Sequence, residues 1–450
     1  MEAIDRQRLK SLMEREQQKF VAERPKSAAL FERARKSLLG GVPMNWMAKW
    51  AGAFPPFVRE ARGSEIFDVD GHGYVDLCLG DTGAMTGHSP SATVSAIEQQ
   101  VRRGITLMLP SEDAAVVGEE LQKRFGLPYW QFALTATDAN RFSIRLARQI
   151  TGRPKILVFN GCYHGTVDET FITLKDGVAQ SRRGNIGPAV DPTVTTRVVE
   201  FNDVDGLEAA LSAGDVACVL AEPALTNVGI VLPEPGYHQA LRDVTRKHGT
   251  LLVIDETHTI CAGTGGYTRA ENLEPDFLVF GKPLAGGVPG ATYGCTEEVA
   301  QCILAQQNLE DCDTGGIGGT LAGNALSLAA MRSTLQKVLI QDAFDRMIPL
   351  AARWTEAVAK AIGDFELPWG VTRLGCRAEY RFASRTPKNG TEAHAAMDFE
   401  LERFMHLYAM NRGILLTPFH NMALMSPATS KEDVDQHTKV FRAAVRDLVG

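Results

Sequence analysis

Asp255 and Lys282 are the two residues of this chain whose types and spacing could do chemistry together. Asp255 ends the apolar run LLVID, and Lys282 follows the apolar run DFLVF. Short runs of branched apolar residues indicate strands buried on both faces, so both side chains emerge at strand ends, where α/β sheets bind ligands. A carboxylate and an amine at one edge could be the counter-ion and the covalent partner of a cofactor. An ordinary strand-end Asp and a solvated Lys are the alternative at this point.

Pyridoxal 5′-phosphate (PLP) is a cofactor that uses both groups. In this hypothesis Lys282 holds the PLP aldehyde as a Schiff base, and Asp255 pairs with the ring nitrogen. The phosphate needs a site of its own. Thr135, Ala136 and Thr137 come just before a helical pattern, and the first turn of a helix offers free N–H groups. The alternative is a plain helix N-cap.

Four further residues could complete the cofactor site. The glycine-rich loop 314–324 contains Thr320, although such loops also form ordinary turns. Tyr163 and His164 lie in GCYHG, directly after the strand-like run KILVF. Tyr163 could stack on the cofactor ring, and His164 could be a base or a structural histidine. Glu222 ends another apolar run and could hydrogen-bond within the site or cap the sheet edge.

The elements that position these residues predict an α/β fold. Between 91 and 280, helical patterns alternate with apolar runs at 155–159, 216–223, 251–256 and 276–280. This alternation indicates a mainly parallel sheet with helices on both faces, and the family resemblance given below implies a sheet of the seven-stranded type. We expect a large domain over 60–330 and a smaller α+β domain built from 1–59 and 331–450. The segment EIFDVDGHGYVDL predicts a hairpin that turns at Asp70-Gly71.

Composition excludes several classes of protein. The chain has 450 residues, of which 44% are apolar and 22% charged, and its formal net charge is −7. A negative charge without a basic cluster argues against nucleic-acid binding. No apolar run is long enough to cross a membrane. The eight cysteines include no C-x-x-C pair, which favours reduced thiols in a cytoplasmic protein over disulfides or zinc, and no metal is expected.

Several motifs in order resemble one known family. They include IFDVDGHGYVDL, TATDANRFSIRLAR, GCYHG, VIDET, FGKPLAGGVPGATYG and GTLAGN. The chain resembles class III PLP-dependent aminotransferases of fold type I, near the branch of glutamate-1-semialdehyde aminomutases and β-amino acid aminotransferases. The resemblance covers most of the chain, from about Leu38 to the C-terminal helix.

The resemblance implies a role for each matching residue. It makes Lys282 the Schiff-base lysine and acid–base catalyst, Asp255 the partner of the ring nitrogen, and Tyr163 the stacking residue. Ala136 and Thr137 bind the phosphate, and Thr320 contacts it from the neighbouring subunit. The resemblance therefore also implies a homodimer with shared active sites.

The chain departs from the family pattern in three places. Thr135-Ala136-Thr137 replaces the usual Ser-Gly-Thr, and Thr257 puts a hydroxyl near the ring where the family has valine. In the segment GGVPMNWMAKW, Met47 stands near the position where aminomutase-like members place an arginine for a substrate carboxylate. A flexible lysine does not reproduce the bidentate contact of arginine.

Candidate substrate-binding residues follow from this departure. Arg377 is our candidate replacement for the missing arginine, and an ion pair of Arg377 with Glu379 or Asp81 is the structural alternative. Lys49 is a further substrate-binding candidate. Four more residues could line an apolar substrate wall or belong to the core: Trp46, Trp50, Phe419 and Met422.

The leading functional hypothesis is a PLP-dependent transaminase. It would move an amino group between an amine or β/ω-amino acid and a keto acid or aldehyde, so its partners are small amine and carbonyl compounds. An intramolecular aminomutase or racemase, and a lyase that eliminates a group from the β carbon, could use the same residues. A non-catalytic protein of the same fold is the alternative of another class, and the presence of Lys282 counts against it.

Overall fold

The computed structural model describes residues 4–306 and 315–450. The chain divides into two compact units, each described by itself below. Unit 1 comprises the residues up to Pro90 together with Asp342–Thr386 and Ala396–Gly450, and unit 2 comprises Ser91–Gln341 and Pro387–Ala395. The predicted boundaries at 60 and 330 differ from those of these units, and the division into domains stays a prediction.

Unit 2 contains a seven-stranded sheet with the strand order β4-β12-β11-β10-β9-β5-β8. Strand β12 is antiparallel to both of its neighbours, and the pairs among β11, β10, β9, β5 and β8 are parallel. The predicted, mainly parallel α/β sheet is therefore confirmed. Its strands are β4 (Tyr129–Ala133), β5 (Lys155–Phe159), β8 (Thr196–Val199), β9 (Val216–Ala221), β10 (Leu251–Asp255), β11 (Phe277–Phe280) and β12 (Ala291–Cys295).

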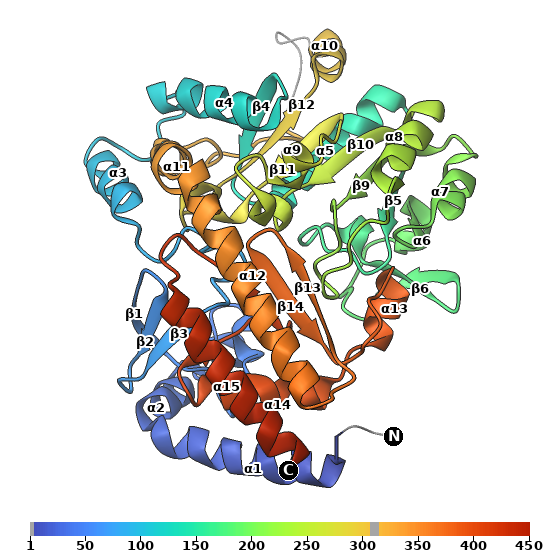
Figure 1. Ribbon diagram of the computed structural model, residues 1–450. Coiled ribbons are helices and arrows are strands. Elements are labelled where there is room, and N and C mark those ends of the chain that lie inside the picture. Colours follow the sequence, from blue (N-terminus) through green and yellow to red (C-terminus); the bar gives the residue numbers. More distant parts are fainter. Residues whose placement is uncertain (1–3, 307–314) are drawn as a thin grey trace. The chain divides into compact units, whose positions relative to one another are not determined.

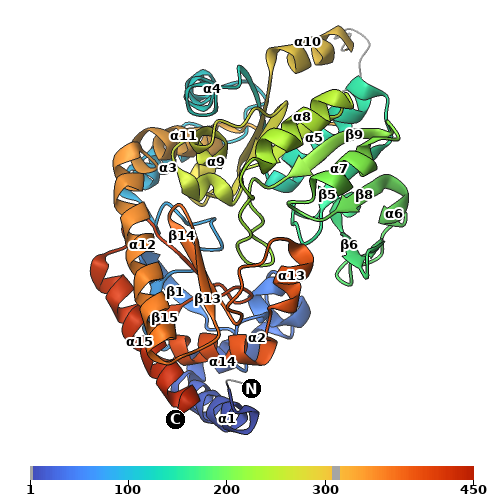
Figure 2. The ribbon, with the colours of Figure 1, turned by 45° about the vertical axis from the view of Figure 1, so that its right-hand side comes forward.

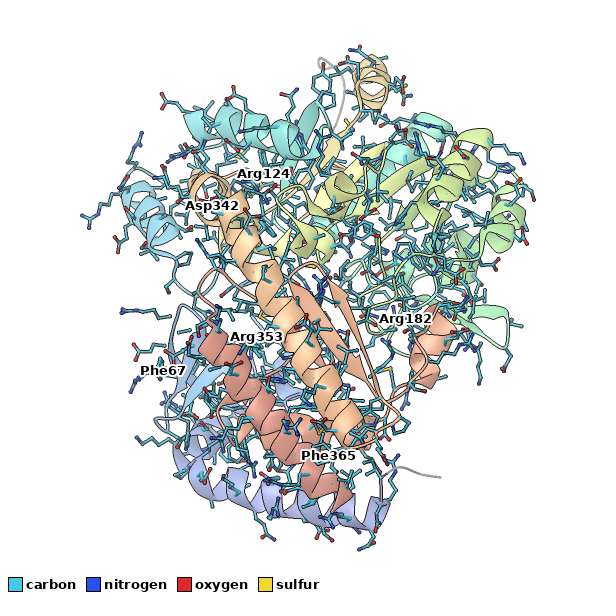
Figure 3. The ribbon with its side chains drawn as sticks, in the orientation of Figure 1. Phe67, Arg124, Arg182, Asp342, Arg353 and Phe365 are labelled. Atoms are coloured by element: carbon cyan, nitrogen blue, oxygen red, sulfur yellow. The ribbon has the colours of Figure 1, made fainter. Side chains whose placement is uncertain are left out.

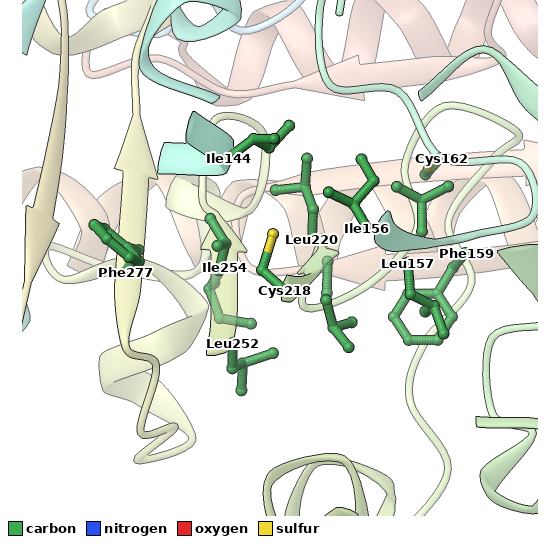
Figure 4. Close-up of a cluster of buried hydrophobic side chains, with 14 of the residues drawn as sticks. Ile144, Ile156, Leu157, Phe159, Cys162, Cys218, Leu220, Leu252, Ile254 and Phe277 are labelled. Carbon is green, nitrogen blue, oxygen red and sulfur yellow. The ribbon is translucent and has the colours of Figure 1, made fainter. Parts of the chain in front are cut away.

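The central strands form because nearly all of their side chains are apolar and buried. Every residue of β9 and β11 is buried, as are the last four residues of β5 and β10. Figure 4 shows Ile156, Leu220 and Ile254, from three adjacent strands, near Ile144 of helix α5 (Ala136–Thr151). Each such side chain contributes about 1.5–3 kcal/mol when fully buried. The sheet edge that carries the polar residues is thus held by a rigid core.

Helices and a two-stranded ribbon surround this sheet within unit 2. Helix α5 packs against β9, β11 and β12, while α7 and α8 pack against each other (Figure 2). Within the described part of the chain, strands β6 and β7 pair only with each other. The other elements are α3 (Ser91–Val101), α4 (Glu112–Phe125), β6 (Ile172–Lys175), β7 (Val178–Ser181), α6 (Pro192–Thr195), α7 (Val204–Leu211), α8 (Tyr237–Lys247), α9 (Gly266–Ala270), α10 (Glu297–Gln306), α11 (Ala325–Ser333) and α13 (Gly390–Ala395).

Unit 1 is an α+β unit with two small sheets. One has the order β1-β2-β3-β15 and the other β13-β14-β16. The predicted hairpin is the antiparallel pair β2–β3, and the Asp68 carboxylate accepts the N–H groups of Asp70, Gly71 and His72 in its turn. The strands are β1 (Val58–Arg62), β2 (Glu65–Asp68), β3 (Gly73–Asp76), β13 (Gly370–Leu374), β14 (Arg377–Arg381), β15 (Ile414–Leu415) and β16 (Met422–Leu424).

Long helices cover these sheets within unit 1 (Figure 1). Helix α14 packs against α1 and α15. Arg353 of α12, labelled in Figure 3, forms hydrogen bonds with Asp435 of α15 at 2.9 and 2.8 Å. No helix among the described residues is long and apolar enough to span a membrane. The helices are α1 (Arg6–Glu23), α2 (Pro25–Ala34), α12 (Gln341–Asp364), α14 (Phe399–Met410) and α15 (Lys431–Val449).

Candidate active site

Asp255, the last residue of β10, is the centre of a buried polar cluster. Its Oδ2 lies 2.9 Å from His164 Nδ1 and accepts a hydrogen bond from Asn140 Nδ2 at 2.8 Å, while its Oδ1 accepts the Thr257 N–H at 3.0 Å. Only 4% of the residue is exposed. A carboxylate with three donors is fixed in direction, which is what a charge partner for a bound ring requires.

The charges of Asp255 and His164 stabilise each other. Burial favours the neutral form of each side chain, but their contact outweighs it. The hydrogen bond and charge of His164, with Thr257 and Asn140, lower the pKa of Asp255 below its usual value. The neighbouring Cys162 and Asp255 raise the pKa of His164 to about 10. At neutral pH the pair is therefore a carboxylate and an imidazolium.

The loop 161–165 brings His164 to Asp255 from the end of β5. Gly165 has a positive φ of 78°, and a Cβ there would lie 2.0 Å from Thr137 Oγ1, so this position requires glycine. The same Thr137 Oγ1 accepts the Thr166 N–H at 3.1 Å. The structure thus joins this loop to the beginning of α5.

Glu222 holds the same loop from the end of β9. Its carboxylate accepts the Tyr163 N–H at 3.3 Å, and the N–H and hydroxyl of Thr226 at 3.1 and 2.5 Å. Burial raises the pKa of Glu222. The half-buried Tyr163 ring makes an edge contact with Phe171 at 6.3 Å between centroids. Glu222 therefore hydrogen-bonds within the cluster, one of the two roles that the sequence left open.

Helix α5 begins at the predicted phosphate loop. Thr135 is its N-cap, and its hydroxyl accepts the Asp138 N–H at 3.1 Å. Ala136 opens the helix, and a Cβ on Gly281 would come within 3.0 Å of the Ala136 side chain. The residue before Lys282 therefore lies against the N-terminus of α5, where backbone N–H groups can bind an anion.

Lys282 follows β11, the strand next to β10. Asp255 pairs in register with Val279, so the ends of both strands lie at one edge. Lys282 has a positive φ of 48°, an unusual conformation for a non-glycine residue. Its Nζ lies 2.7 Å from His258 Nε2. The structure therefore brings the amine and the carboxylate to the same edge of the sheet, as predicted.

Thr257 and Thr320 differ in their surroundings. The Thr257 side chain is buried, and its Oγ1 has no hydrogen-bond partner among the described residues. Thr320 is exposed, and Gly318 and Gly319 just before it have positive φ angles. Thr314, the first residue of the glycine-rich loop, lies outside the described residues.

Three of the predicted substrate-binding residues contact one another in unit 1. The rings of Trp46 and Phe419 meet edge to face at 6.0 Å, and Lys49 Nζ lies 5.4 Å from the Phe419 centroid. Trp50 packs against a core cluster around Phe20. These contacts give a small aromatic group with a cation beside it.

Arg377 already has a carboxylate partner. It is 1% exposed, its Nη2 donates to Asp81 at 3.2 Å, and its Nε donates to the sulfur of Met422 at 2.5 Å. Met422 is fully buried in β16. The ion pair with Asp81 is the structural alternative that the sequence suggested, and Met422 belongs to the core.

Sequence reasoning missed Asn140 and His258. Asn140 lies on the buried side of α5, one turn from its start, so its spacing could have indicated a side chain that reaches the sheet. His258 directly follows Thr257. A single histidine there carried no signal of its own, because its contact with Lys282 depends on the turn that follows β10.

A sequence model of the family described as aminotransferase class-III matches residues 46–445. The chain belongs to this family. It is a PLP-dependent enzyme of the class, and the strand-end cluster lies within the matched region. Among curated relatives, a glutamate-1-semialdehyde 2,1-aminomutase from Chloroflexus aggregans is 33% identical over 440 residues, which cover 94% of this chain and 98% of that protein.

Solved structures resemble the chain over nearly its whole length. A protein described as a glutamate-1-semialdehyde-aminomutase from Pseudomonas aeruginosa is 49% identical, with a TM-score of 0.97 and coverage of 99% of this chain and 100% of that chain. An omega-transaminase from Sphaerobacter thermophilus is 27% identical, with a TM-score of 0.85 and coverage of 94% and 98%. The matches confirm the fold type I α/β architecture predicted from the sequence.

The described residues fit PLP. A buried, ionised carboxylate suits a protonated ring nitrogen, an amine lies at the same edge, and a helix N-terminus suits a phosphate. The buried Nε2 of His164 and Oγ1 of Thr257 have no partner among the described residues. Bound there, PLP supplies an electron sink for the bonds at a substrate Cα. Among the described residues no group of His, Cys, Asp and Glu could hold a metal, and the expected absence of a metal stays a prediction.

Proposed function

We propose that the chain is a transaminase that transfers an amino group from an amine or β/ω-amino acid to a keto acid or aldehyde. The observation that supports the cofactor chemistry of this proposal is the Asp255 carboxylate, which three hydrogen bonds and the His164 charge keep ionised in a buried site. A fixed negative charge there favours a protonated ring nitrogen, and such a ring withdraws electrons from the substrate Cα. The contacts among Trp46, Lys49 and Phe419 support transamination in particular.

In this proposal Lys282 both binds the cofactor covalently and moves the proton. Once the substrate amine has replaced it, Lys282 Nζ is free of the covalent bond and takes the proton from the substrate Cα. With PLP bound, the same Nζ would return this proton to the cofactor, so that Lys282 would act as both base and acid. Asp255 keeps its charge throughout because its donors do not change.

The cofactor's other groups have their own proposed partners. Thr135, Ala136 and Thr137 bind the phosphate at the beginning of α5. Tyr163 lies on the ring, in a loop that Glu222 fixes from β9. His164 and Thr257 orient Asp255, and Thr257 also offers its hydroxyl to the ring side.

The segment GGVPMNWMAKW in unit 1 supports transamination of varied amines over the binding of one carboxylated substrate. Met47 lies near the position at which the family resemblance predicts an arginine for a substrate carboxylate, and it is 43% exposed. Trp46, Lys49 and Phe419 would bind the substrate through an aromatic surface and a single point charge. For Arg377, the contacts with Asp81 and Met422 support a structural role over the proposed clamp.

An intramolecular aminomutase is the second candidate. Relatives described as glutamate-1-semialdehyde aminomutases, one of them 49% identical, support it. Such an enzyme would move the amino group within glutamate 1-semialdehyde and release an isomer. The cofactor chemistry and the roles of Lys282 and Asp255 would be the same.

A single-turnover experiment separates the two candidates. The enzyme with PLP is mixed with one amino donor and no acceptor, for a panel of amines, β-amino acids and glutamate 1-semialdehyde. A transaminase releases one carbonyl product per site and keeps the amino group on the cofactor, which changes the cofactor's absorbance. Release of an isomer from glutamate 1-semialdehyde, with no turnover of the other donors, would overturn transamination in favour of the aminomutase.

The role of Lys282 has its own test. We expect Lys282→Ala to lose the visible absorbance of the lysine-bound cofactor and to lower turnover by at least about 10³-fold. Lys337→Ala removes an exposed lysine of the same unit and should change neither. A wild-type spectrum and rate for Lys282→Ala would refute the site itself, whichever reaction the enzyme performs.

We also propose a homodimer in which Thr320 of the partner subunit contacts the phosphate. Ile105, Leu107, Met108 and Leu109 form an exposed apolar run in unit 2, with Met108 and Leu109 at least 75% exposed. Exposed apolar runs of this kind mark interaction surfaces. Light scattering should give the mass of a dimer, and Leu109→Asp should shift it toward the monomer. The cytoplasmic location stays a prediction.

A further inference from the structure

Lys282 has a titratable neighbour that the proposed mechanism does not use. Its Nζ lies 2.7 Å from Nε2 of His258. His258 follows Thr257 and precedes the short 3₁₀ helix Thr259–Ala262, and Lys282 opens another, Lys282–Ala285. Because β10 and β11 are adjacent and parallel, the two turns lie at the same sheet edge. The contact therefore depends on two elements of the central sheet.

The distance limits how many protons the two nitrogens can hold. A nitrogen–nitrogen hydrogen bond of this length contains one proton between two lone pairs, and a second proton would put two positive charges in contact. A proton can pass directly between the two nitrogens.

The acidic groups of the same turn are engaged elsewhere. Asp255 binds His164, Asn140 and the Thr257 N–H. The buried Glu256 accepts hydrogen bonds from the Thr259 hydroxyl at 2.5 Å and from the backbone N–H groups of two residues of α9, Tyr267 and Thr268. These contacts direct both carboxylates away from a role as proton carrier for Lys282.

We infer that His258 is the general acid–base partner of Lys282. When Lys282 is released from the cofactor, the N–H bond at His258 Nε2 breaks and leaves its electron pair on the imidazole. The proton bonds to the lone pair of Lys282 Nζ, which has just received the pair of its broken bond to carbon. The reverse transfer occurs when Lys282 binds again. The inference rests on the proposed covalent role of Lys282.

Histidine suits this step because of its acidity. Its ordinary pKa is about 6.5, whereas that of a lysine is about 10.4. A catalyst whose pKa is close to the working pH can both give and take a proton, and such a group contributes on the order of 10²–10⁴-fold in rate.

The test measures how fast the apoprotein captures PLP, with no amino substrate present. The visible absorbance of the lysine-bound cofactor is followed after mixing, from pH 5 to pH 10, for the wild type, His258→Phe and His258→Gln. Glutamine keeps a hydrogen-bonding group near Nζ but cannot carry the proton. We expect both variants to capture PLP about 10²-fold more slowly and to show a flatter dependence of the rate on pH than the wild type.

Matched controls separate folding from chemistry. His248→Gln removes another histidine of unit 2, one that binds Glu208 at 2.8 Å, and should leave the rate and its pH profile unchanged. If the bulky or amide variants fail to fold, His258→Ala with added imidazole replaces them, and the rate should rise with the imidazole concentration. Absence of imidazole rescue in a folded His258→Ala variant would overturn the inference.

The outcomes also separate this inference from the proposed function. A wild-type rate and pH profile in His258→Gln would reduce His258 to a hydrogen-bond partner and overturn the inference. Formation of the same absorbance in Lys282→Ala would instead refute the role of Lys282. Because no amino donor is present, the result does not depend on whether the enzyme is a transaminase or an aminomutase.

Discussion

Two groups of residues differ in how firmly they are held: the strand-end cluster of unit 2, which is Asp255 with its hydrogen-bond partners, and the aromatic group of unit 1, which is Trp46, Lys49 and Phe419. Asp255 and His164 are at most 4% exposed and form hydrogen bonds of 2.8–3.0 Å with their neighbours. Trp46, Lys49 and Phe419 are joined by ring contacts of 5.4–6.0 Å, and Lys49 is exposed. The strand-end cluster therefore holds the Asp255 carboxylate in one position, whereas the aromatic group is a partly exposed surface with few fixed contacts.

The difference suggests which part of the molecule can change between relatives. A buried charge that loses a partner costs several kcal/mol, so replacements in the strand-end cluster are strongly opposed. Substitutions on an exposed surface usually change stability by less than about 0.5 kcal/mol. We therefore expect the cofactor chemistry to be common to the family, while the choice of substrate depends on residues such as Met47.

Asp255→Asn has the largest expected effect, because it removes the buried negative charge of the strand-end cluster. We expect turnover to fall by about 10²–10⁴-fold, since an amide cannot keep the ring nitrogen protonated and leaves the His164 charge unpaired. PLP should still bind through Lys282, as measured by the cofactor's visible absorbance. A turnover within tenfold of the wild type would contradict the electron-sink role.

Asp276→Asn is the matched control for that experiment. Asp276 is also a buried aspartate of unit 2, but it precedes β11 at the opposite edge of the sheet and binds Arg242 at 2.7 and 2.8 Å. Its replacement should lower the unfolding temperature and leave the turnover of the folded enzyme nearly unchanged. A similar loss of turnover in both variants would point to a general loss of structure.

Arg377→Ala tests whether a buried residue of unit 1 belongs to the fixed or to the variable region. We expect a loss of about 3 kcal/mol in the free energy of unfolding, because the Asp81 carboxylate loses its partner. Activity on carboxylated substrates and on simple amines should fall equally. Unchanged stability with a loss confined to carboxylated substrates would support the clamp. Combining the variant with Asp81→Asn in a double-mutant cycle isolates the ion pair.

The sequence predicted the strand-end residues better than the residues that support them. Asp255 and Lys282 could be found because each ends a buried apolar run, and such runs show directly in the amino-acid order. Asn140 and His258 depend on contacts across 115 and 24 residues. No local pattern encodes such contacts. The sequence offered both Glu379 and Asp81 as ion-pair partners of Arg377 but could not decide between them, because the packing of β14 determines which carboxylate lies next to the guanidinium.

His164→Gln tests how the stability contributed by the His164–Asp255 ion pair depends on pH. The pKa of His164 is raised to about 10, so its contribution to stability is full below about pH 6.5 and is lost as the pH rises through 10. The lowered pKa of Asp255 makes its contribution disappear in acid, below about pH 4. The wild type should exceed the variant by about 1.5–3 kcal/mol between pH 4 and 6.5, and by less toward pH 10. Urea unfolding measures this difference, and a constant difference across pH would contradict the ionised pair.

Met47→Arg has the smallest expected effect and addresses the variable region directly. An arginine at this position would supply a bidentate contact to a substrate carboxylate. In an exposed setting such a pair contributes at most about 1 kcal/mol, which corresponds to a KM up to about fivefold lower for carboxylated substrates. The kcat should change little, because the strand-end cluster is untouched. Leu39→Arg adds the same charge at another exposed residue and controls for net charge. If both variants lower KM equally, the lower KM comes from a general attraction of anions, and the residues around Met47 do not select the substrate.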